Sequence, residues 1–154
     1  MINGIGNNND NVIIGNSNNN RLYGGLGKDM LTGGGGTVDR DIFGYRELKE
    51  SILIGYDIIT DFNSKDFIDA PLAVETEKLT KSIGSIATLN ETELFSLLSE
   101  NLFIPNSVNA FMVTNLQGTF IAMNDERTGY QSESDSLIFL ANYTLSTTKY
   151  VDFI

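Results

Sequence analysis

The sequence predicts a mainly β fold, and three observations support this prediction. Glycine recurs at every ninth position near the N-terminus, and an oxygen-bearing side chain and an apolar side chain recur with the same step. Acidic and apolar residues then alternate with a period of two, and a later region contains strand patterns around one amphipathic helix. We therefore expect stacked repeats capped by antiparallel strands over residues 1–70, and a small α+β domain over residues 71–154.

Each nine-residue repeat predicts one turn followed by one short strand. The turn needs positive φ at several residues, which glycine adopts freely and asparagine tolerates better than most residues. The third repeat reads Gly-Gly-Leu-Gly-Lys-Asp-Met-Leu-Thr and matches Gly-Gly-x-Gly-x-Asp-x-U-x at every fixed position. In the strand half, Ile13, Leu22 and Leu31 are expected to face inward. The fourth repeat runs from Gly33 to a strand that follows Asp41 and carries about three inserted residues.

The composition limits the ligands that this chain can bind. Its 154 residues include 20 acids and 10 bases, for a formal net charge of −10, and contain no histidine or cysteine. Disulfides, thiolate or imidazole metal sites and His-dependent nucleophiles are therefore excluded. Hard cations with all-oxygen ligand shells, above all Ca²⁺, fit best. Acidity without a basic cluster argues against nucleic acid or an anionic membrane as partner.

The repeats resemble those of the RTX family of secreted calcium-binding proteins. In that family, nonapeptides wind into a right-handed parallel β-roll, and Ca²⁺ lies between loops two repeats apart, held by backbone carbonyls and by the Asp of each loop. The resemblance implies that loop 6–11 faces loop 24–29 and that loop 15–20 faces loop 33–41. The implied ligands are Gly6, Asn7, Asn9, Asn11, Gly24, Gly25, Gly27 and Asp29 in the first pair, and Asn16, Asn18, Asn20, Gly33, Gly34, Gly36 and Asp41, with Asp39 as an outer charge, in the second.

Two repeats depart from the family pattern. Asn11 and Asn20 stand where the family has Asp, so each implied site keeps one carboxylate, Asp29 or Asp41. Fewer carboxylates weaken calcium binding, toward dissociation constants of roughly 10⁻⁴ to 10⁻³ M. An alternative needs no metal, because asparagines at stacked positions can form an amide ladder that stabilises the coil.

The segment after the repeats resembles the flank of the roll in serralysin-type metallopeptidases. Period-two alternation over residues 41–44, 56–62 and 66–69 predicts antiparallel strands that close the coil. The zinc motif of those peptidases requires histidine, so we expect no enzyme activity here. For the acids of this segment, loop capping, further calcium binding and solvation all remain open, with solvation expected for most. These acids are Asp57, Asp61, Asp66 and Asp69.

The C-terminal half predicts one helix and four strands. Asn90 as N-cap and Glu93 form a capping box, and Leu94 and Leu98 share one apolar face. The expected strands cover residues 108–114, 119–123, 137–143 and 150–154, and a hairpin turn joins the first two. The order of Ile86–Glu91, a Leu-rich helix, Gly118–Asp125, Gly129 and Asp135–Ile138 is similar to the bluetail domain of cyanobacterial surface proteins.

A second candidate calcium loop lies between two of these strands. Counted from Asn124, oxygen-bearing residues fall at positions three, five, nine and twelve, with Gly129 at six and a carbonyl at seven, as in an EF-hand loop. Strand flanks argue against an EF-hand, so a polar loop without metal is the alternative. The candidate ligands are Asn124, Glu126, Thr128, Tyr130, Ser132 and Asp135.

The last residues, Val151-Asp152-Phe153-Ile154, resemble the uncleaved signal of type I secretion substrates, although a final strand is also compatible. We find no apolar segment suited to membrane insertion and no N-terminal signal peptide. The prediction is a secreted or cell-surface module, exported by the type I secretion machinery, that folds when it binds calcium outside the cell. Alternatives are a calcium-rigidified structural or adhesive surface domain, or the non-catalytic C-terminal part of a larger secreted hydrolase. A glycosidase is disfavoured because the acids follow turns.

Overall fold

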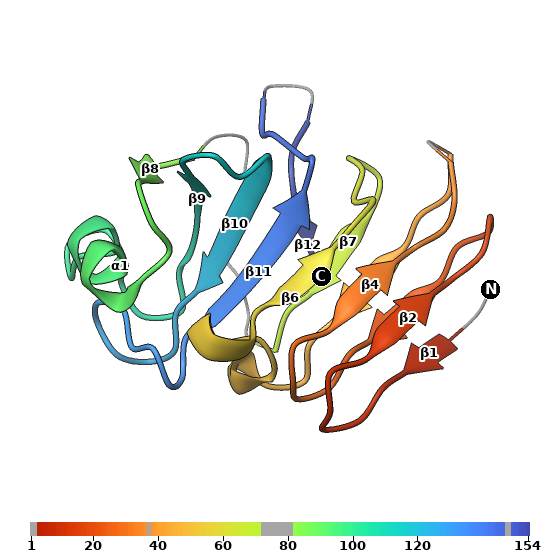
Figure 1. Cartoon of the computed structure of the whole chain (residues 1–154), viewed down its shortest axis with the longest axis horizontal. Helices are drawn as coiled ribbons and strands as arrows, with labels where there is room; N and C mark the ends of the chain where they lie inside the picture. Colours follow the sequence, from red (N-terminus) through yellow and green to blue (C-terminus); the bar gives the residue numbers. More distant parts are fainter. Residues whose placement is uncertain (1–2, 37, 72–81, 147–148) are drawn as a thin grey trace.

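The computed structural model describes residues 3–36, 38–71, 82–146 and 149–154. The described residues form a mainly β fold with two sheets (Figure 1). One sheet has the strand order β1 (Asn3–Ile5), β3 (Arg21–Tyr23), β5 (Ile42–Gly44), β7 (Phe67–Asp69) and β12 (Asp152–Phe153). The other has the order β2 (Val12–Ile14), β4 (Met30–Thr32), β6 (Asp57–Ile59), β11 (Ser136–Ala141), β10 (Gly118–Met123), β9 (Val108–Val113) and β8 (Ser85–Ile86).

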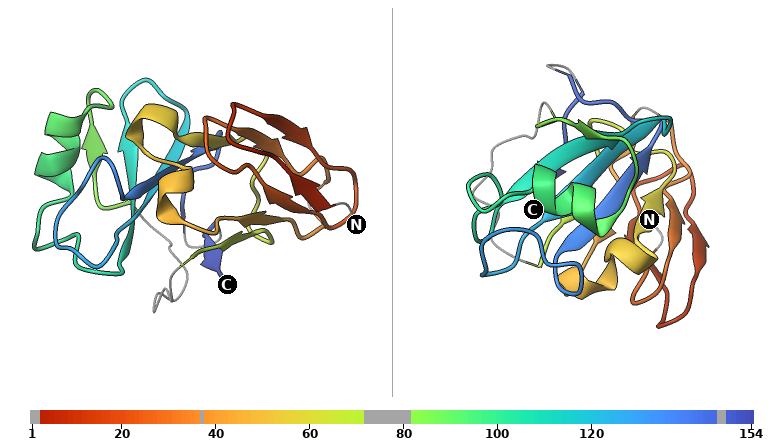
Figure 2. Two further views of the ribbon diagram at one scale, coloured as in Figure 1. Left: turned by 90° about the horizontal axis from the view of Figure 1, so that it is seen from below. Right: turned by 60° about the vertical axis from the view of Figure 1, so that its left-hand side comes forward.

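Consecutive strands of the N-terminal half alternate between the two sheets. Neighbours among β1, β3, β5 and β7, and among β2, β4 and β6, are all parallel. The register pairs Gly4 with Leu22 and Ile13 with Leu31, which is a step of two repeats. The left view of Figure 2 shows the resulting two layers of strands at the N-terminal end. The nine-residue step therefore sets both the alternation and the register.

The strands after the repeats are parallel, so the prediction of antiparallel capping strands is wrong. β5, β6 and β7 each extend a sheet in the direction set by the repeats. Period-two alternation is common to both kinds of strand, and only the pairing partners distinguish them. The triplet Asp-x-apolar of the third repeat returns at each of these strands, with its apolar residue fully buried as Phe43, Ile59 and Ile68.

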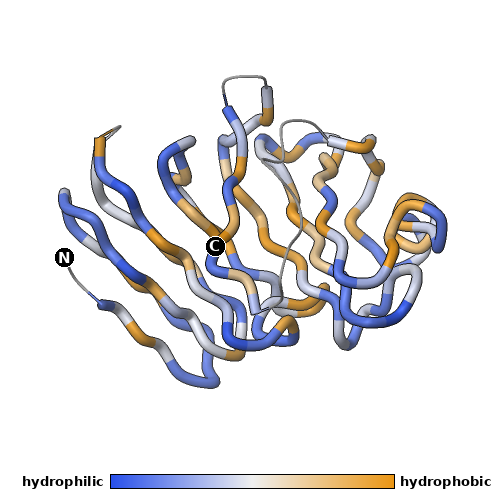
Figure 3. Tube along the Cα trace, turned by 180° about the vertical axis from the view of Figure 1, so that it is seen from behind, coloured by the Kyte–Doolittle hydropathy of each residue, from blue (hydrophilic) through white to orange (hydrophobic). Residues whose placement is uncertain are grey.

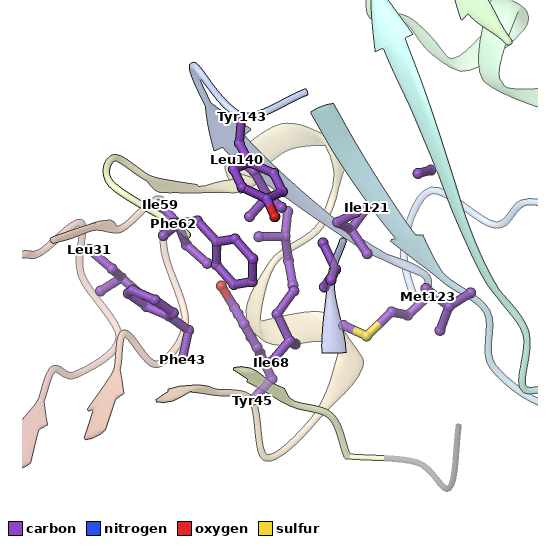
Figure 4. Packing of buried hydrophobic residues seen from close by; sticks show 14 of the residues in the cluster. Leu31, Phe43, Tyr45, Ile59, Phe62, Ile68, Ile121, Met123, Leu140 and Tyr143 are labelled. Carbon is purple, nitrogen blue, oxygen red and sulfur yellow. The ribbon is translucent and has the colours of Figure 1, made fainter. Parts of the chain in front are cut away.

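One hydrophobic core lies between the sheets and connects both halves of the chain. Leu22 and Leu31 are fully buried, as predicted, and Ile13 is partly buried against the same cluster. Ile121 and Leu140 from the C-terminal half belong to this cluster as well (Figure 4). β6 also pairs in parallel with β11. One sheet and one core thus cross the predicted boundary at residue 70, beyond which residues 72–81 lie outside the described chain.

A second core covers the outer face of the C-terminal strands. The helix α1 (Glu91–Leu97) begins at the predicted cap, where the Glu93 backbone N–H donates to Asn90 Oδ1 over 2.9 Å. Leu94 and Leu98 are fully buried in this core, as the shared helix face predicts. The predicted hairpin is also present, because β9 and β10 pair antiparallel.

Polar and apolar positions separate along the coil. Figure 3 shows apolar segments along the inner strands and hydrophilic segments at the turns of the N-terminal half. Two short 3-10 helices, η1 (Leu48–Glu50) and η2 (Leu53–Gly55), connect β5 to β6. Within the described ranges, no helix has both the length and the apolar character needed to cross a membrane.

Candidate cation sites at the stacked loops

The structure places the predicted loop pairs against each other. A Cβ atom added at Gly6 would overlap the carbonyl oxygen of Gly24, and one added at Gly25 would overlap that of Asn7. Gly25 and Gly27 have φ of 97° and 114°. These positions therefore require glycine for two reasons, the close approach of the loops and the left-handed backbone conformation.

The second loop pair is stacked in the same way, with one exception. A Cβ at Gly15 would overlap the carbonyl oxygen of Gly33, and one at Gly34, where φ is 85°, would lie 3.0 Å from the carbonyl carbon of Gly15. A Cβ at Gly36 would meet no atom within 4 Å. The structure therefore brings Gly33 and Gly34 into the stack and leaves Gly36 outside it.

Each sheet carries a column of Asn and Asp side chains, at the first residue of a strand or at the residue just before it. In both columns, the Oδ1 atom of each carboxylate accepts the backbone N–H of the preceding member of the same column, on the neighbouring strand of the sheet. The even column, beside β2, β4 and β6, consists of Asn11, Asp29 and Asp57. The odd column, beside β3, β5 and β7, consists of Asn20, Asp41 and Asp66.

The even column contains buried carboxylate oxygens that have no hydrogen-bond partner. Asp29 is 1% exposed and Asp57 is 0% exposed, and Oδ2 of each lacks a partner within the described residues. The Oδ2 atom of Asp29 lies against Gly24 of its own loop. The buried hydroxyl of Tyr45 lies close enough to Asp57 to lower the pKa of that carboxyl as a hydrogen-bond donor does, although the pair does not reach full hydrogen-bond geometry. Burying an unpaired charge costs several kcal/mol, so these oxygens favour a bound cation or a proton.

Burial changes the acidity of the even column. It raises the pKa of Asp57 to about 8, against the opposing effect of the hydrogen bond from the Asp29 N–H. Burial also raises the pKa of Asp29, with an added contribution from the charge of Asp10. The same desolvation, together with the Asp57 charge, raises the pKa of Tyr45 well above its ordinary value. A divalent cation would favour the ionised carboxylates and oppose these shifts.

In the odd column, side-chain amides satisfy the carboxylates. Asp41 Oδ1 accepts both the N–H and the Nδ2 of Asn20, over 2.7 and 2.9 Å. Asp66 Oδ2 accepts the N–H and the Nδ2 of Asn63, each over 2.9 Å. Burial nevertheless raises the pKa of Asp66 to about 7 and raises that of Asp41. The two columns thus share a backbone arrangement but differ at their third members, because Asp66 Oδ2 has two donors from Asn63 and Asp57 Oδ2 has none among the described residues.

Oxygen atoms converge on the side-chain amide of Asn20. Its Nδ2 lies 2.9 Å from the Asn16 carbonyl, 3.0 Å from the Gly33 carbonyl and 2.9 Å from Asp41 Oδ1, and it also contacts the Asn18 carbonyl. An amide nitrogen has only two hydrogens, so four acceptors exceed its donors. Converging carbonyl and carboxylate oxygens are the ligands that Ca²⁺ prefers. The amide therefore occupies the kind of position that the family resemblance assigns to an ion.

Asp39 lies in the inserted part of the fourth repeat. It is 4% exposed, and both of its carboxylate oxygens are buried without a partner among the described residues. Its carboxylate is packed against Gly35. The insertion therefore turns this acid inward, beside the odd column, instead of toward solvent.

The remaining asparagines of the repeat loops form turns. Asn7 Oδ1 accepts the N–H and Nδ2 of Asn9 over 2.9 Å, and Asn16 Oδ1 accepts the same groups of Asn18 over 2.9 and 3.3 Å. Asn11 Oδ1 accepts the Asn7 N–H over 2.8 Å. Side chains of this type stabilise turns without metal. At these positions the backbone carbonyls, and not the amide oxygens, remain as candidate ligands.

The loop with EF-hand spacing does not gather its predicted ligands. Asp135 is fully buried, and its two oxygens accept the Asp125 N–H over 3.0 Å and the Gln131 N–H over 2.6 Å. Asn124 turns its Nδ2 to the carbonyls of Phe103 and Ile104, which leaves its buried Oδ1 without a partner in the described structure. The other candidates lie elsewhere: Glu126 and Thr128 are exposed, the ring of Tyr130 packs in the core, and Ser132 contacts Glu91. These contacts fit the polar-loop alternative.

Sequence reasoning missed the third member of each column. Asp57 and Asp66 are buried, so the expectation that most acids of this segment face water is wrong for these two. Asp61 is exposed and caps a repeat loop, with its two oxygens accepting the Gly33 and Gly34 N–H groups over 2.8 Å each. The available signal was the Asp-x-apolar triplet, which recurs at the start of each strand from β4 to β7. Because the loops between these strands differ in length, the triplets are not evenly spaced in the sequence.

The described residues contain no group of three or more acidic side chains arranged to hold a metal ion. Any cation site here therefore consists of one or two carboxylates and neutral oxygens. Comparison with known proteins gives no assignment, since no protein-family model matches the chain and no curated protein matches it.

Proposed function

We propose that this chain is a secreted or surface-located calcium-binding module whose N-terminal half is a right-handed parallel β-roll. The observation that carries the proposal is the Asp29 carboxylate, buried between stacked glycine loops with Oδ2 unpartnered in the described structure. Backbone carbonyls of the facing loops would complete the shell, as the RTX resemblance implies. Oxygen ligands from carboxylate and carbonyl groups suit Ca²⁺.

Calcium binding would be coupled to folding. Only the stacked coil brings the two loops of a pair together, so the ion binds the folded chain and stabilises it by mass action. Where free calcium is scarce, the buried carboxylates destabilise the coil and leave the chain loose for export through a type I machinery. The last strand supports this order of events, because β12 pairs with β7 in the folded chain, so a signal at residues 151–154 is free only before folding.

A second candidate is a structural or adhesive surface domain whose coil holds together largely without metal. The amide-satisfied odd column favours it, because the hydrogen bonds from Asn20 and Asn63 need no ion. Both candidates assign the chain the same non-enzymatic character. They differ in how strongly folding depends on calcium.

Calorimetric and circular-dichroism titration of the full chain with calcium tests the proposal. We expect saturable binding in the millimolar range or tighter, together with a rise in melting temperature, and Asp29→Asn should reduce both. The matched control is Asp10→Asn, which removes an equal charge from an exposed residue of the facing loop. If calcium produces neither heat nor a change in melting temperature, calcium binding is excluded and the structural candidate remains.

A further inference from the structure

We propose a second cation site in the even column, between Asp29 and Asp57, one coil beyond the sequence repeats, with the Tyr45 hydroxyl beside it. Its ligand would be a hard divalent cation of the size of Ca²⁺. The inference rests on the proposed function only for the identity of the ion. It goes beyond that function by placing a site on residues that the repeat pattern does not contain.

The geometry places the two carboxylates side by side. β4 and β6 pair in parallel with Met30 opposite Ile58, so the residues that precede them, Asp29 and Asp57, are neighbours across the sheet. Adjacent strands lie about 4.8 Å apart. Calcium–oxygen distances of about 2.4 Å allow one ion to bridge two carboxylates at that separation. The free Oδ2 atoms are the available ligands, because the Oδ1 atoms already accept backbone N–H groups.

Two neutral oxygens lie close to this pair in the fold. Tyr45 is 3% exposed, and its hydroxyl has no hydrogen-bond partner among the described residues. Figure 4 shows its ring extending into the interior between the two sheets. On the loop side, Gly55 approaches the preceding coil, and a Cβ there would lie 3.4 Å from the Gly27 carbonyl oxygen. A phenol oxygen and a backbone carbonyl would extend the shell that the two carboxylates begin.

Among the described residues, no basic side chain forms an ion pair with Asp29 or Asp57. The ion pairs in the described structure join Arg21 to Asp69, Lys49 to Glu47 and Arg127 to Asp125. Lys28, which adjoins Asp29 in the sequence, places its Nζ 4.7 Å from the centre of the Tyr56 ring. Glu50 adds a further negative charge near both carboxylates. Two adjacent buried carboxylates without a protein cation form a site where an external cation would bind.

The odd column contains an equivalent pair of neighbouring carboxylates, Asp41 and Asp66, with which the proposed site can be compared. Ile42 pairs with Phe67, so Asp41 and Asp66 are neighbours in the same register, and Asp66 Oδ1 accepts the Asp41 N–H over 2.9 Å. There, however, Asn63 donates two hydrogen bonds to Asp66 Oδ2. The segment before Asp57 reads Leu-Ile-Gly-Tyr and contains no side-chain amide. The proposed site therefore belongs to the even column alone.

Calorimetry of the full chain with Asp57→Asn and Asp66→Asn as a matched pair tests this inference. Asn keeps the Oδ1 acceptor and removes the charge in both variants. We expect Asp57→Asn to lose one calcium ion per chain, or to weaken one binding event at least tenfold, while Asp66→Asn keeps the wild-type stoichiometry. An unchanged stoichiometry and affinity in Asp57→Asn would overturn the second site but leave the proposed function standing. No calcium binding by the wild type would reject both.

A second measurement covers the case in which Asp57→Asn does not fold. Terbium(III) replaces calcium in oxygen sites, and its luminescence can be excited through a nearby tyrosine. We expect Tyr45→Phe, which keeps the buried ring, to lower the tyrosine-sensitised terbium emission at least twofold at equal terbium occupancy. Tyr150→Phe, on the segment between β11 and β12, serves as the control. Equal emission from wild type and Tyr45→Phe would show that no ion lies beside this phenol and would contradict the proposed placement.

Discussion

The even and odd columns have the same backbone arrangement but leave their carboxylates in different states. In each, a carboxylate Oδ1 accepts an N–H from the previous coil, and the side chain is buried. In the odd column, the amides of Asn20 and Asn63 donate further hydrogen bonds to Asp41 Oδ1 and Asp66 Oδ2, while the even column leaves the Oδ2 atoms of Asp29 and Asp57 unpartnered within the described chain. A local amide thus decides whether a buried carboxylate acts as a structural acceptor or as a candidate ligand.

Of the changes considered, removal of calcium should have the largest effect on stability, because only the unpartnered carboxylates of the even column need an ion. One saturated site contributes about 2.7 kcal/mol at a calcium concentration of 100 times the dissociation constant. Each kcal/mol shifts the melting temperature of a chain of this size by about 2–4 °C. We expect the melting temperature at a calcium concentration 100 times the dissociation constant to exceed that in chelator by roughly 5–10 °C for each occupied site. Scanning calorimetry under both conditions measures this, with magnesium as the control ion.

Asn20→Asp should make the odd column resemble the even one. The substitution removes the amide that donates both to Asp41 and to the surrounding carbonyls. It also adds a buried negative charge beside that of Asp41. Removing one partner of such a buried bond costs about 1–3 kcal/mol, and the like charge adds to this. We expect the variant to be destabilised in chelator and restored by calcium.

Denaturant unfolding with and without calcium distinguishes the outcomes for Asn20→Asp. Asn19→Asp in the same loop is the control, since Asn19 is exposed and its Oδ1 acceptor for the Arg40 N–H is retained. Equal destabilisation of Asn20→Asp in calcium and in chelator would show that the converging oxygens do not form a cation site.

The sequence predicts the regular part of this molecule well because one rule repeats there. The nine-residue step identifies the inward positions of Leu22 and Leu31 and the loops that face each other, and the capping box at Asn90 identifies the helix. The rule fails where loop lengths vary. Asp41, Asp57 and Asp66 each begin an Asp-x-apolar triplet, but unequal spacing obscures the coil and makes its strands resemble antiparallel ones.

Tyr45 and Asn63 illustrate a second limit. Tyr45 acts on Asp57 through a contact formed by the fold, Asn63 acts on Asp66 three residues along the chain, and neither occupies a position of the repeat. No local pattern distinguishes Asn63, which satisfies Asp66, from the many asparagines that form exposed turns. Whether a buried carboxylate is satisfied depends on such single neighbours, so the two columns could be compared only in the structure.

The stability of the calcium-free protein should decrease as pH rises from about 4 to about 8. Burial raises the folded-state pKa of Asp57 to about 8 and of Asp66 to about 7, above the unfolded value near 3.8. The stabilising protonated state is therefore fully present below pH 4 and is lost as pH rises through the folded-state pKa values. Denaturant unfolding in chelator across this range tests the slope. Asp57→Asn should flatten the stability profile between about pH 7 and pH 8, where, of these two groups, Asp57 alone still titrates. A wild-type profile that is flat or rises with pH would contradict these shifts.

The smallest effect is expected for Asn63→Ala. The substitution removes the Nδ2 bond to Asp66 and the acceptor for the Lys65 N–H, while the backbone N–H of residue 63 still donates to Asp66 Oδ2. Because that oxygen keeps one donor, the loss should be about 1 kcal/mol, with no new response to calcium. Asn63→Asp keeps the acceptor for Lys65, removes the side-chain donor and adds a charge beside Asp66. Unfolding in chelator and in calcium should therefore show a calcium-dependent stability for Asn63→Asp alone. A calcium response in Asn63→Ala would mean that the backbone donor does not satisfy Asp66, and that the two columns differ less than their hydrogen bonds indicate.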